Sequence, residues 1–261
     1  MQNTSPTNLT LFCWNIANPS KKRAETQSAW IRKQNADVFV LTECKNSEGC
    51  SFIEKYLSAY GYNVIFPKPE GNEYGVIIAS KHKLTPTAFS KGVGYIQSRV
   101  VSASLQPPLF SGEIEIVGTY LPSRDSSKEK IGRKKQFINS LVMNIKEYKF
   151  PSYSIFCGDL NILEPYHIPH YSIFQDWEYN FYNFLKSFME DAYRYLNPEH
   201  QEYSWVGRTG DGYRYDHCFT SLELLPLVRR CYYLHEPRIE KLSDHSALIT
   251  HLALQLPRGD R

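Results

Sequence analysis

None of the six cysteines in this sequence stands in a Cys-x-x-Cys pair, the spacing that many structural zinc sites and disulfide oxidoreductases use. Cys13, Cys157 and Cys218 lie inside apolar or strand-like runs, where free cysteine behaves as a small hydrophobic residue. A zinc site or a disulfide framework is therefore not expected. Cysteines of this kind are typical of proteins in a reducing compartment.

Long apolar runs are also missing. No stretch approaches the roughly 18 residues that a membrane-spanning helix needs, so we expect no membrane partner. Residues 1–6 are polar and lack the basic segment and apolar core of a signal peptide. Together with the free cysteines, these absences predict a cytoplasmic protein.

A large excess of one charge is the third absence. The formal net charge is +3, which is too small to indicate nucleic-acid binding by itself. Basic residues do cluster locally, as Lys21, Lys22 and Arg23 and as Lys128, Lys130, Arg133, Lys134 and Lys135. Such runs usually form a solvated helix face. They indicate a contact with a phosphate backbone only where the fold brings them close to an active centre.

What the sequence does contain is enough apolar material for a large core. Hydrophobic residues make up 42% of the 261 residues and aromatic residues 14%, and no repeat or Pro/Gly-rich linker divides the chain. This length is near the upper limit for one domain. We predict a single domain over residues 9–256, an extended or disordered tail over residues 1–8, and a monomer.

Apolar runs bounded by Gly, Pro, Asn or Asp predict strands along the whole chain. They cover Leu9–Asn15, Ala36–Glu43, Asn63–Phe66, Tyr74–Ser80, Ser98–Leu105, Glu113–Tyr120, Tyr153–Asp159, Tyr215–Thr220, Cys231–His235 and Ser246–Leu254. Apolar residues three and four apart predict helices around 52–60 and 137–145, and residues 177–189 are helix-like but less regular. Residues 163–175 read as a loop. The order predicts an α/β (α+β) domain with two facing sheets and helices outside.

The most informative motif is Gly158-Asp159-Leu160-Asn161, followed far along the chain by Ser243-Asp244-His245. Asp159 and Asn161 stand two apart at the end of an apolar strand, so their side chains are expected on the same side. Asp244 and His245 would bring a carboxylate and an imidazole to the same edge. Such groups can activate water, bind phosphoryl oxygens and hold a divalent metal, which predicts a metal-dependent phosphodiesterase.

Three further polar residues close apolar strands. Asn15 would usually be a turn former at such a position, and Tyr120 would usually be a core residue. Glu43 alone would be a solvated charge, but as a third acidic group at strand ends it becomes an oxygen ligand suited to Mg²⁺. Each signal is weak singly, and their shared position at strand ends makes the set specific.

Asp216 lies within a late strand and has two interpretations. It is either a structural residue, as an ion-pair partner of Arg214 or part of a loop backbone, or a carboxylate that orients His245 and fixes its tautomer. His245 alone would more often be a satisfied core or surface histidine. The sequence leaves both interpretations open.

Taken in order, these motifs resemble the endonuclease/exonuclease/phosphatase superfamily. The matching motifs run through residues 9–254 and are Trp14-Asn15, Leu41-Thr42-Glu43, Tyr74-Gly75-Val76, Thr119-Tyr120-Leu121-Pro122, Gly158-Asp159-Leu160-Asn161, Arg214-Tyr215-Asp216 and Ser243-Asp244-His245. At the position of Tyr120 other branches have a histidine, and the tyrosine here resembles the exonuclease III and abasic-site (AP) endonuclease branch. The resemblance implies a four-layered α/β sandwich of two packed, mostly antiparallel sheets flanked by helices.

The resemblance also implies roles for the motif residues. Glu43 and Asp244 would hold Mg²⁺, with Mn²⁺ as a substitute, and Asp159 would position or deprotonate the attacking water. Asp216 would orient His245. The groups that would bind the phosphoryl oxygens are Asn15, Tyr120, Asn161 and His245.

The sequence departs from this branch around the site. Ala17 replaces a polar residue that helps to hold the metal, a DNA-contacting Gly-Leu-Arg is missing, and Ser123 replaces Asn or Gln. The expected function is hydrolysis of phosphodiester bonds in nucleic acid, most simply DNA during repair. The alternatives are an RNA, nucleotide, tyrosyl-DNA or phospholipid ester, and a binding protein without turnover. The aromatic segments 166–177 and 203–215 either stack on bases or pack together, and packing is the expected case.

Overall fold

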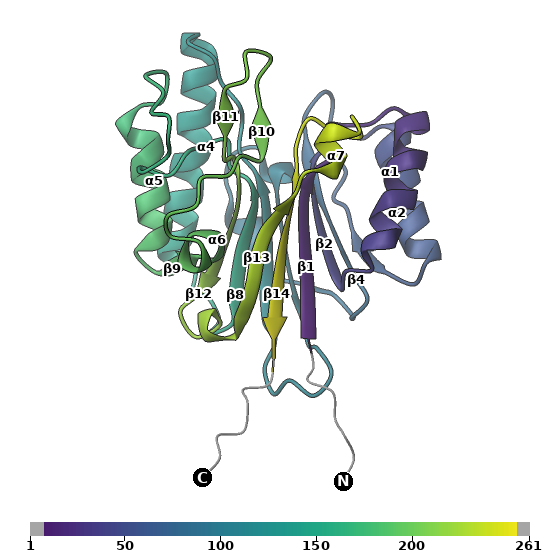
Figure 1. Ribbon diagram of the computed structural model, residues 1–261. Coiled ribbons are helices and arrows are strands. Elements are labelled where there is room, and N and C mark those ends of the chain that lie inside the picture. Colours follow the sequence, from purple (N-terminus) through teal and green to yellow (C-terminus); the bar gives the residue numbers. More distant parts are fainter. Residues whose placement is uncertain (1–7, 255–261) are drawn as a thin grey trace.

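Two six-stranded sheets form the centre of the molecule (Figure 1). The computed structural model describes residues 8–254, so the predicted tail lies outside the described residues except for Asn8, which begins the first strand. The first sheet has the order β13-β14-β1-β2-β4-β3 and contains β1 (Asn8–Asn15), β2 (Val38–Cys44), β3 (Asn63–Ile65), β4 (Gly75–Ser80), β13 (Val228–Leu234) and β14 (Ala247–Ala253). Only β1 and β2 pair in parallel in this sheet.

The second sheet repeats this plan. Its order is β5-β6-β7-β8-β12-β9, and it contains β5 (Thr85–Pro86), β6 (Val100–Leu105), β7 (Ile114–Tyr120), β8 (Ser154–Asp159), β9 (Met189–Asp191) and β12 (Asp216–Ser221). Only β7 and β8 pair in parallel here. The prediction of two mostly antiparallel sheets is confirmed. A separate short hairpin joins β10 (Trp205–Val206) and β11 (Gly212–Tyr213).

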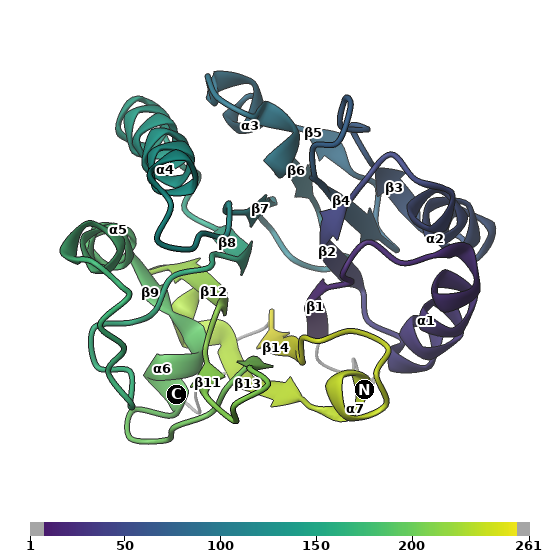
Figure 2. The same cartoon turned by 90° about the horizontal axis from the view of Figure 1, so that it is seen from above.

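Helices cover the outer face of each sheet, which gives four layers (Figure 2). On the first sheet lie α1 (Lys21–Gln34) and α2 (Glu48–Ala59), and on the second lie α4 (Lys128–Glu147) and α5 (Asp176–Lys186). The short helices are α3 (Phe89–Gly92), α6 (Ala192–Leu196) and α7 (Glu236–Ile239), with 3-10 turns η1 (Gln97–Arg99) and η2 (Leu225–Leu227). The four-layered sandwich is therefore confirmed. Among the described residues, no helix is both long and apolar enough to cross a membrane.

Burial on both faces explains why most strands read as continuous apolar runs. In β1, Leu11 and Cys13 join the core between the sheets, whereas Phe12 and Trp14 pack under the helices. The predicted strands are all present with ends shifted by up to three residues, and the helices around 52–60 and 137–145 and the loop over 163–175 are present as well. The patterns of apolar residues did not predict α1 or the short strands β5, β9, β10 and β11.

Strand direction determines where the polar strand ends meet. Both parallel pairs present their carboxyl ends at one edge of the sandwich, where β1 ends at Asn15 and β8 at Asp159. Tyr120 at the end of β7 is in register with Asp159, and so is Asp216 at the start of the antiparallel β12. The candidate residues therefore gather at one end of the two sheets, which is the upper end of the strands in Figure 1.

Gly158, directly before Asp159, allows β7 and β8 to approach closely. Its φ is 146°, and a Cβ atom built on it would lie 1.8 Å from the Thr119 carbonyl oxygen. Because the backbone conformation and the close contact both exclude a side chain, Gly158→Ala is expected to lower the free energy of unfolding by at least about 1–3 kcal/mol. Urea denaturation monitored by circular dichroism measures this change.

Gly132 provides the matched control for that substitution. It lies in α4, and a Cβ atom added there meets nothing within 4 Å. Gly132→Ala is expected to raise the free energy of unfolding by about 0.5–1 kcal/mol, because alanine favours helix over glycine. Equal stability of the two variants would contradict the assigned role of Gly158.

Candidate active site

Asn15 connects the two sheets beneath the site. Its Nδ2 donates to Glu43 Oε2 (2.9 Å) on the first sheet and to Asp159 Oδ2 (2.8 Å) on the second, and its Oδ1 accepts from the Ala17 amide (2.8 Å). The side chain is fully buried. In this structure the Asn15 amide is therefore used to hold the two carboxylates, and its predicted contact with the substrate stays a prediction.

Tyr120 and Glu43 meet across the sheets. The Tyr120 hydroxyl donates to Glu43 Oε2 (3.1 Å), and Arg99 lies over the Tyr120 ring with its Cζ 4.6 Å from the ring centroid. Burial and the nearby Glu43 raise the pKa of Tyr120 well above its ordinary value. The hydroxyl therefore stays protonated at neutral pH and remains a hydrogen-bond donor.

His245 is held by Asp216, as the orienting interpretation predicts. Its Nδ1 lies 2.7 Å from Asp216 Oδ2, and its Nε2 lies 3.8 Å from Asp159 Oδ2. Burial disfavours the imidazolium, but the carboxylates of Asp216 and Asp159 outweigh it and raise the pKa of His245 to about 10. The ring is therefore positively charged at neutral pH, and its Nε2 can donate toward the pocket.

Asp159 is the most perturbed acid of the site. Burial raises its pKa to about 7, repulsion from Asp216 adds to this, and the imidazolium of His245 opposes it. A carboxylate with such a pKa can exchange a proton near neutral pH, which suits a general base. Asp159 lines the pocket even though only 1% of its surface is exposed.

Asn161 reaches the pocket by a turn and not by strand alternation. β8 ends at Asp159, and Asn161 has a φ of 47°, so the predicted two-residue period does not apply. Its Nδ2 donates to the Leu121 carbonyl (3.0 Å), and its backbone carbonyl accepts from the buried Lys134 Nζ (2.5 Å). Lys134 in turn pairs with the buried Glu178 (2.6 Å). The sequence did not predict this support from α4 and α5.

The donor set fits a divalent cation. The carboxylates of Glu43, Asp159 and Asp244 line one pocket, and ligand atoms of Asp159, Asp216 and His245 lie within 4.8 Å of one another. Asp216 Oδ1 is buried without a hydrogen-bond partner. Four carboxylates beside one imidazole leave an excess of negative charge, and carboxylate oxygens are hard ligands. Ala17 adds no side-chain oxygen to this set.

The pocket around these residues has a volume of about 410 Å³ and two unlike walls. One wall is cationic and consists of Arg99, Arg124, Lys130 and Arg133. Two members of the predicted basic run thus reach the site, whereas Lys134 from the same run is buried below it. Nearby acids hold several of these cations, since Glu73 pairs with both Arg99 and Arg133.

The other wall is aromatic and comes from the β10–β11 hairpin and the start of β12. It presents Trp205 and Tyr215, and the Trp205 Nε1 donates to Asp244 Oδ2 (3.0 Å). Tyr213 stacks on Tyr215 with ring centroids 5.2 Å apart and on Tyr171 at 4.3 Å. These segments therefore pack on one another, as expected, while two of their rings still face the pocket.

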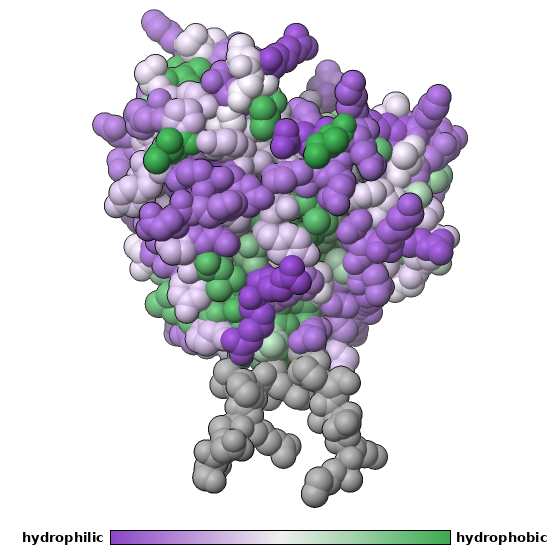
Figure 3. Space-filling view, in the orientation of Figure 1, coloured by the Kyte–Doolittle hydropathy of each residue, from purple (hydrophilic) through white to green (hydrophobic). Residues whose placement is uncertain are grey.

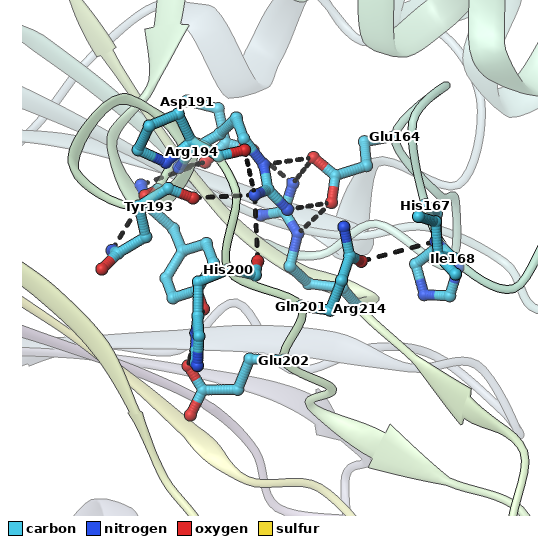
Figure 4. Close-up of polar contacts among 12 residues, drawn as sticks. Glu164, His167, Ile168, Asp191, Tyr193, Arg194, His200, Gln201, Glu202 and Arg214 are labelled. Atoms are coloured by element: carbon cyan, nitrogen blue, oxygen red, sulfur yellow. Dashed lines mark hydrogen bonds and ion pairs between the residues drawn. The ribbon is translucent and has the colours of Figure 1, made fainter.

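A buried ionic network supports this wall from behind (Figure 4). The fully buried Arg214 donates to Glu164 Oε2 and to Asp191 Oδ2, both at 2.8 Å, and Arg194 also pairs with Glu164 (2.6 Å). Arg214 is followed directly by Tyr215 and Asp216. Because Arg214 uses Asp191 and Glu164, the alternative that Asp216 is the partner of Arg214 is not supported.

Comparison with known proteins identifies the family. A model of the Endonuclease/Exonuclease/phosphatase family matches residues 12–245, which is most of the chain. The chain belongs to this family. Proteins of the family generally depend on divalent metals, in agreement with the donor set of the pocket.

Individual proteins are similar to this chain in fold or in sequence. An AP endonuclease from Archaeoglobus fulgidus superposes with a TM-score of 0.77 at 24% identity, over 93% of this chain and 98% of that one. A 3′–5′ exonuclease from Neisseria meningitidis gives 0.76 at 22% identity, over 94% and 99%. A DNA-(apurinic or apyrimidinic site) endonuclease from Dictyostelium discoideum is 24% identical over 249 residues, covering 84% of this chain. This chain spans only 64% of that relative's length.

Proposed function

We propose that this protein is a Mg²⁺-dependent phosphodiesterase that hydrolyses phosphodiester bonds in nucleic acid, with DNA as the first candidate. The observation that carries the proposal is the contact of His245 with both Asp216 and Asp159 in a pocket that Glu43 also lines. This arrangement combines Asp159 as an acid with a raised pKa, His245 as a fixed cationic donor, and Glu43 as a carboxylate beside space for a metal. Such a set is suited to displacement at phosphorus.

Each residue has a distinct part in this proposal. Asp159 accepts the proton of the attacking water, and His245 Nε2 and the Tyr120 hydroxyl donate to phosphoryl oxygens as negative charge develops there. Glu43 and Asp244 would hold Mg²⁺, which when bound supplies positive charge to the phosphate. Asn15 holds Glu43 and Asp159 in place.

The pocket walls favour nucleic acid over other phosphate esters. The cationic wall can follow a phosphate backbone, and Trp205 and Tyr215 offer flat rings to a base. On the upper part of the face shown in Figure 3, apolar residues occur as separate spots among hydrophilic ones and not as the broad apolar patch that a lipid surface would favour.

Two of the structural relatives suggest that strand ends are a second kind of substrate. They are the 3′–5′ exonuclease and a Neisseria 3′ phosphatase bound to a product DNA hairpin, which superposes with a TM-score of 0.77 at 20% identity. The aromatic wall beside Asp159 favours this second candidate, because an unpaired terminal base can stack there.

Cleavage of three labelled DNAs separates these candidates. They are a duplex with one abasic-site analogue, its undamaged twin, and a duplex with a recessed 3′ end, each incubated with Mg²⁺, with Mn²⁺ and with EDTA. We expect cleavage in both metals and none in EDTA. Incision only at the lesion indicates an AP endonuclease, and shortening from the 3′ end indicates an exonuclease. No cleavage of any DNA, with hydrolysis of RNA or nucleotide esters instead, would contradict the assignment to DNA.

A further inference from the structure

A second cationic pocket adjoins the catalytic one. It has a volume of about 480 Å³, and its lining includes Arg23, Arg238 and Lys241 together with Asp244. Asp244 also lines the catalytic pocket, so the two pockets are direct neighbours. The catalytic residues described above do not use these three cations.

The three cations come from separate segments and meet at one pocket. Arg23 lies on α1, Arg238 on α7, and Lys241 in the loop before β14. Within residues 8–254, none of the three lies in an ion pair. In contrast, the four cations of the catalytic wall are all paired with acids. Three unpaired cations beside one pocket repel one another, and an anion between them would remove that repulsion.

The two guanidinium groups are anchored on one side only. Arg23 Nη2 donates to the Ala17 carbonyl, and its buried Nε has no hydrogen-bond partner in the part of the chain that the structure describes. Arg238 Nε donates to Ser246 Oγ (3.2 Å), and its two terminal nitrogens have no hydrogen-bond acceptor among residues 8–254. A buried N–H without an acceptor is unfavourable, so a ligand with several acceptor oxygens would stabilise this arrangement.

The backbone beside these side chains is also strained. Ala17 and Lys241, which both line the pocket, have φ values of 51° and 59°. Residues other than glycine rarely keep such values unless the surrounding structure enforces them, and they occur often at ligand sites. The one acid in the pocket, Asp244, already accepts a hydrogen bond from Trp205 and does not balance three positive charges.

We propose that this pocket binds a phosphate of the substrate strand that flanks the phosphate being cleaved. The inference rests on the proposed function, because it assumes a nucleic-acid strand whose successive phosphates pass Asp244 from one pocket to the other. Guanidinium groups match phosphate oxygens in charge and in planar geometry. The pocket therefore fixes the position of the strand and contributes to binding, and it takes no part in bond breaking.

Binding of a labelled oligonucleotide, without turnover, tests the proposal. The host is Asp159→Asn in EDTA, and fluorescence anisotropy gives Kd over a range of salt concentrations. Arg238→Gln and Lys241→Gln in this host are each expected to weaken binding and to reduce the slope of log Kd against log [salt] by about 0.7–0.9. Lys55→Gln, an equal charge change at an exposed position of α2, is expected to leave the slope unchanged.

The outcomes separate this inference from the proposed function. Slopes equal to that of Lys55→Gln, with intact thermal unfolding, would overturn the pocket assignment even if the unmodified protein cleaves DNA. Lower slopes support the pocket even if no nucleic acid is cleaved. Inorganic phosphate tests the source of the anion. If it shifts the Arg23 and Arg238 Nε–H signals in ¹⁵N spectra while both variants bind the oligonucleotide normally, the pocket takes free phosphate and the strand assignment fails.

Discussion

Replacing His245 with alanine is expected to lower kcat by about 10²–10³ and to change KM much less. His245 Nε2 faces the pocket as a charged donor, because Asp216 holds Nδ1 at 2.7 Å and the two carboxylates raise the pKa of the ring to about 10. Its main effect is therefore to stabilise the negative charge that develops on the phosphate in the transition state. Steady-state kinetics with saturating Mg²⁺ on the best DNA substrate measures the change.

A matched histidine variant controls for this prediction. His82 follows β4 at the end of the sheet away from the site, since Gly75 at the other end of β4 pairs with Cys44. His82→Ala is expected to retain the activity of the unmodified protein. Asp216→Asn keeps the shape of the orienting group and removes its charge, so it should lower kcat less than His245→Ala does. Full activity of His245→Ala would remove His245 from the mechanism.

Replacing Arg214 with methionine is expected to lower the free energy of unfolding by about 3–5 kcal/mol. The substitution leaves Asp191 and Glu164 as buried carboxylates without their shared cation. Burial alone would raise the pKa of Asp191, but Arg214 and His217 outweigh it and hold this pKa well below its ordinary value. Urea denaturation at neutral pH gives the change.

The pH dependence of this loss follows from the sign of that shift. A carboxyl group with a depressed pKa in the folded state stabilises the protein above its unfolded pKa of about 3.9, and this contribution disappears as the pH falls. The stability difference between the protein and Arg214→Met should therefore shrink in acid. Arg229→Met, at an exposed position of β13, is the control and should change stability by less than about 0.5 kcal/mol. If Arg214→Met lowered the stability as little as Arg229→Met does, the role of the network would be contradicted.

The predictability of the fold follows from how each element is buried. Strands such as β1 are covered on both faces, so they read as apolar runs whatever their partners are. Helix α1 was not predicted because two of its four buried residues, Gln27 and Ser28, are polar. Only Ala24 and Ile31 are left as buried apolar residues, too few to show a helical period. The missed strands are two or three residues long, and their pairing depends on distant segments.

The same reasoning explains the site. Glu43, Tyr120 and Asp159 were predictable because each stands at or beside the carboxyl end of a strand in a parallel pair, and such ends share an edge. The burial of Asn15 was not predictable, since it depends on contacts to both sheets at once. Nor was the support of Asn161 by Lys134, which requires α4 to pack beside the turn after β8. Sequence patterns identify strand ends, and packing decides what lies behind them.

The most direct test of the account compares the protein with Asp159→Asn, expressed and purified side by side, on one duplex DNA substrate with Mg²⁺ under single-turnover conditions. The account predicts that the unmodified protein cleaves the duplex and that the variant, with the proposed base removed, is slower by at least about 10². Equal rates for the two proteins, or no cleavage by either on DNA, RNA or nucleotide esters, would contradict a phosphodiesterase centre built around Asp159.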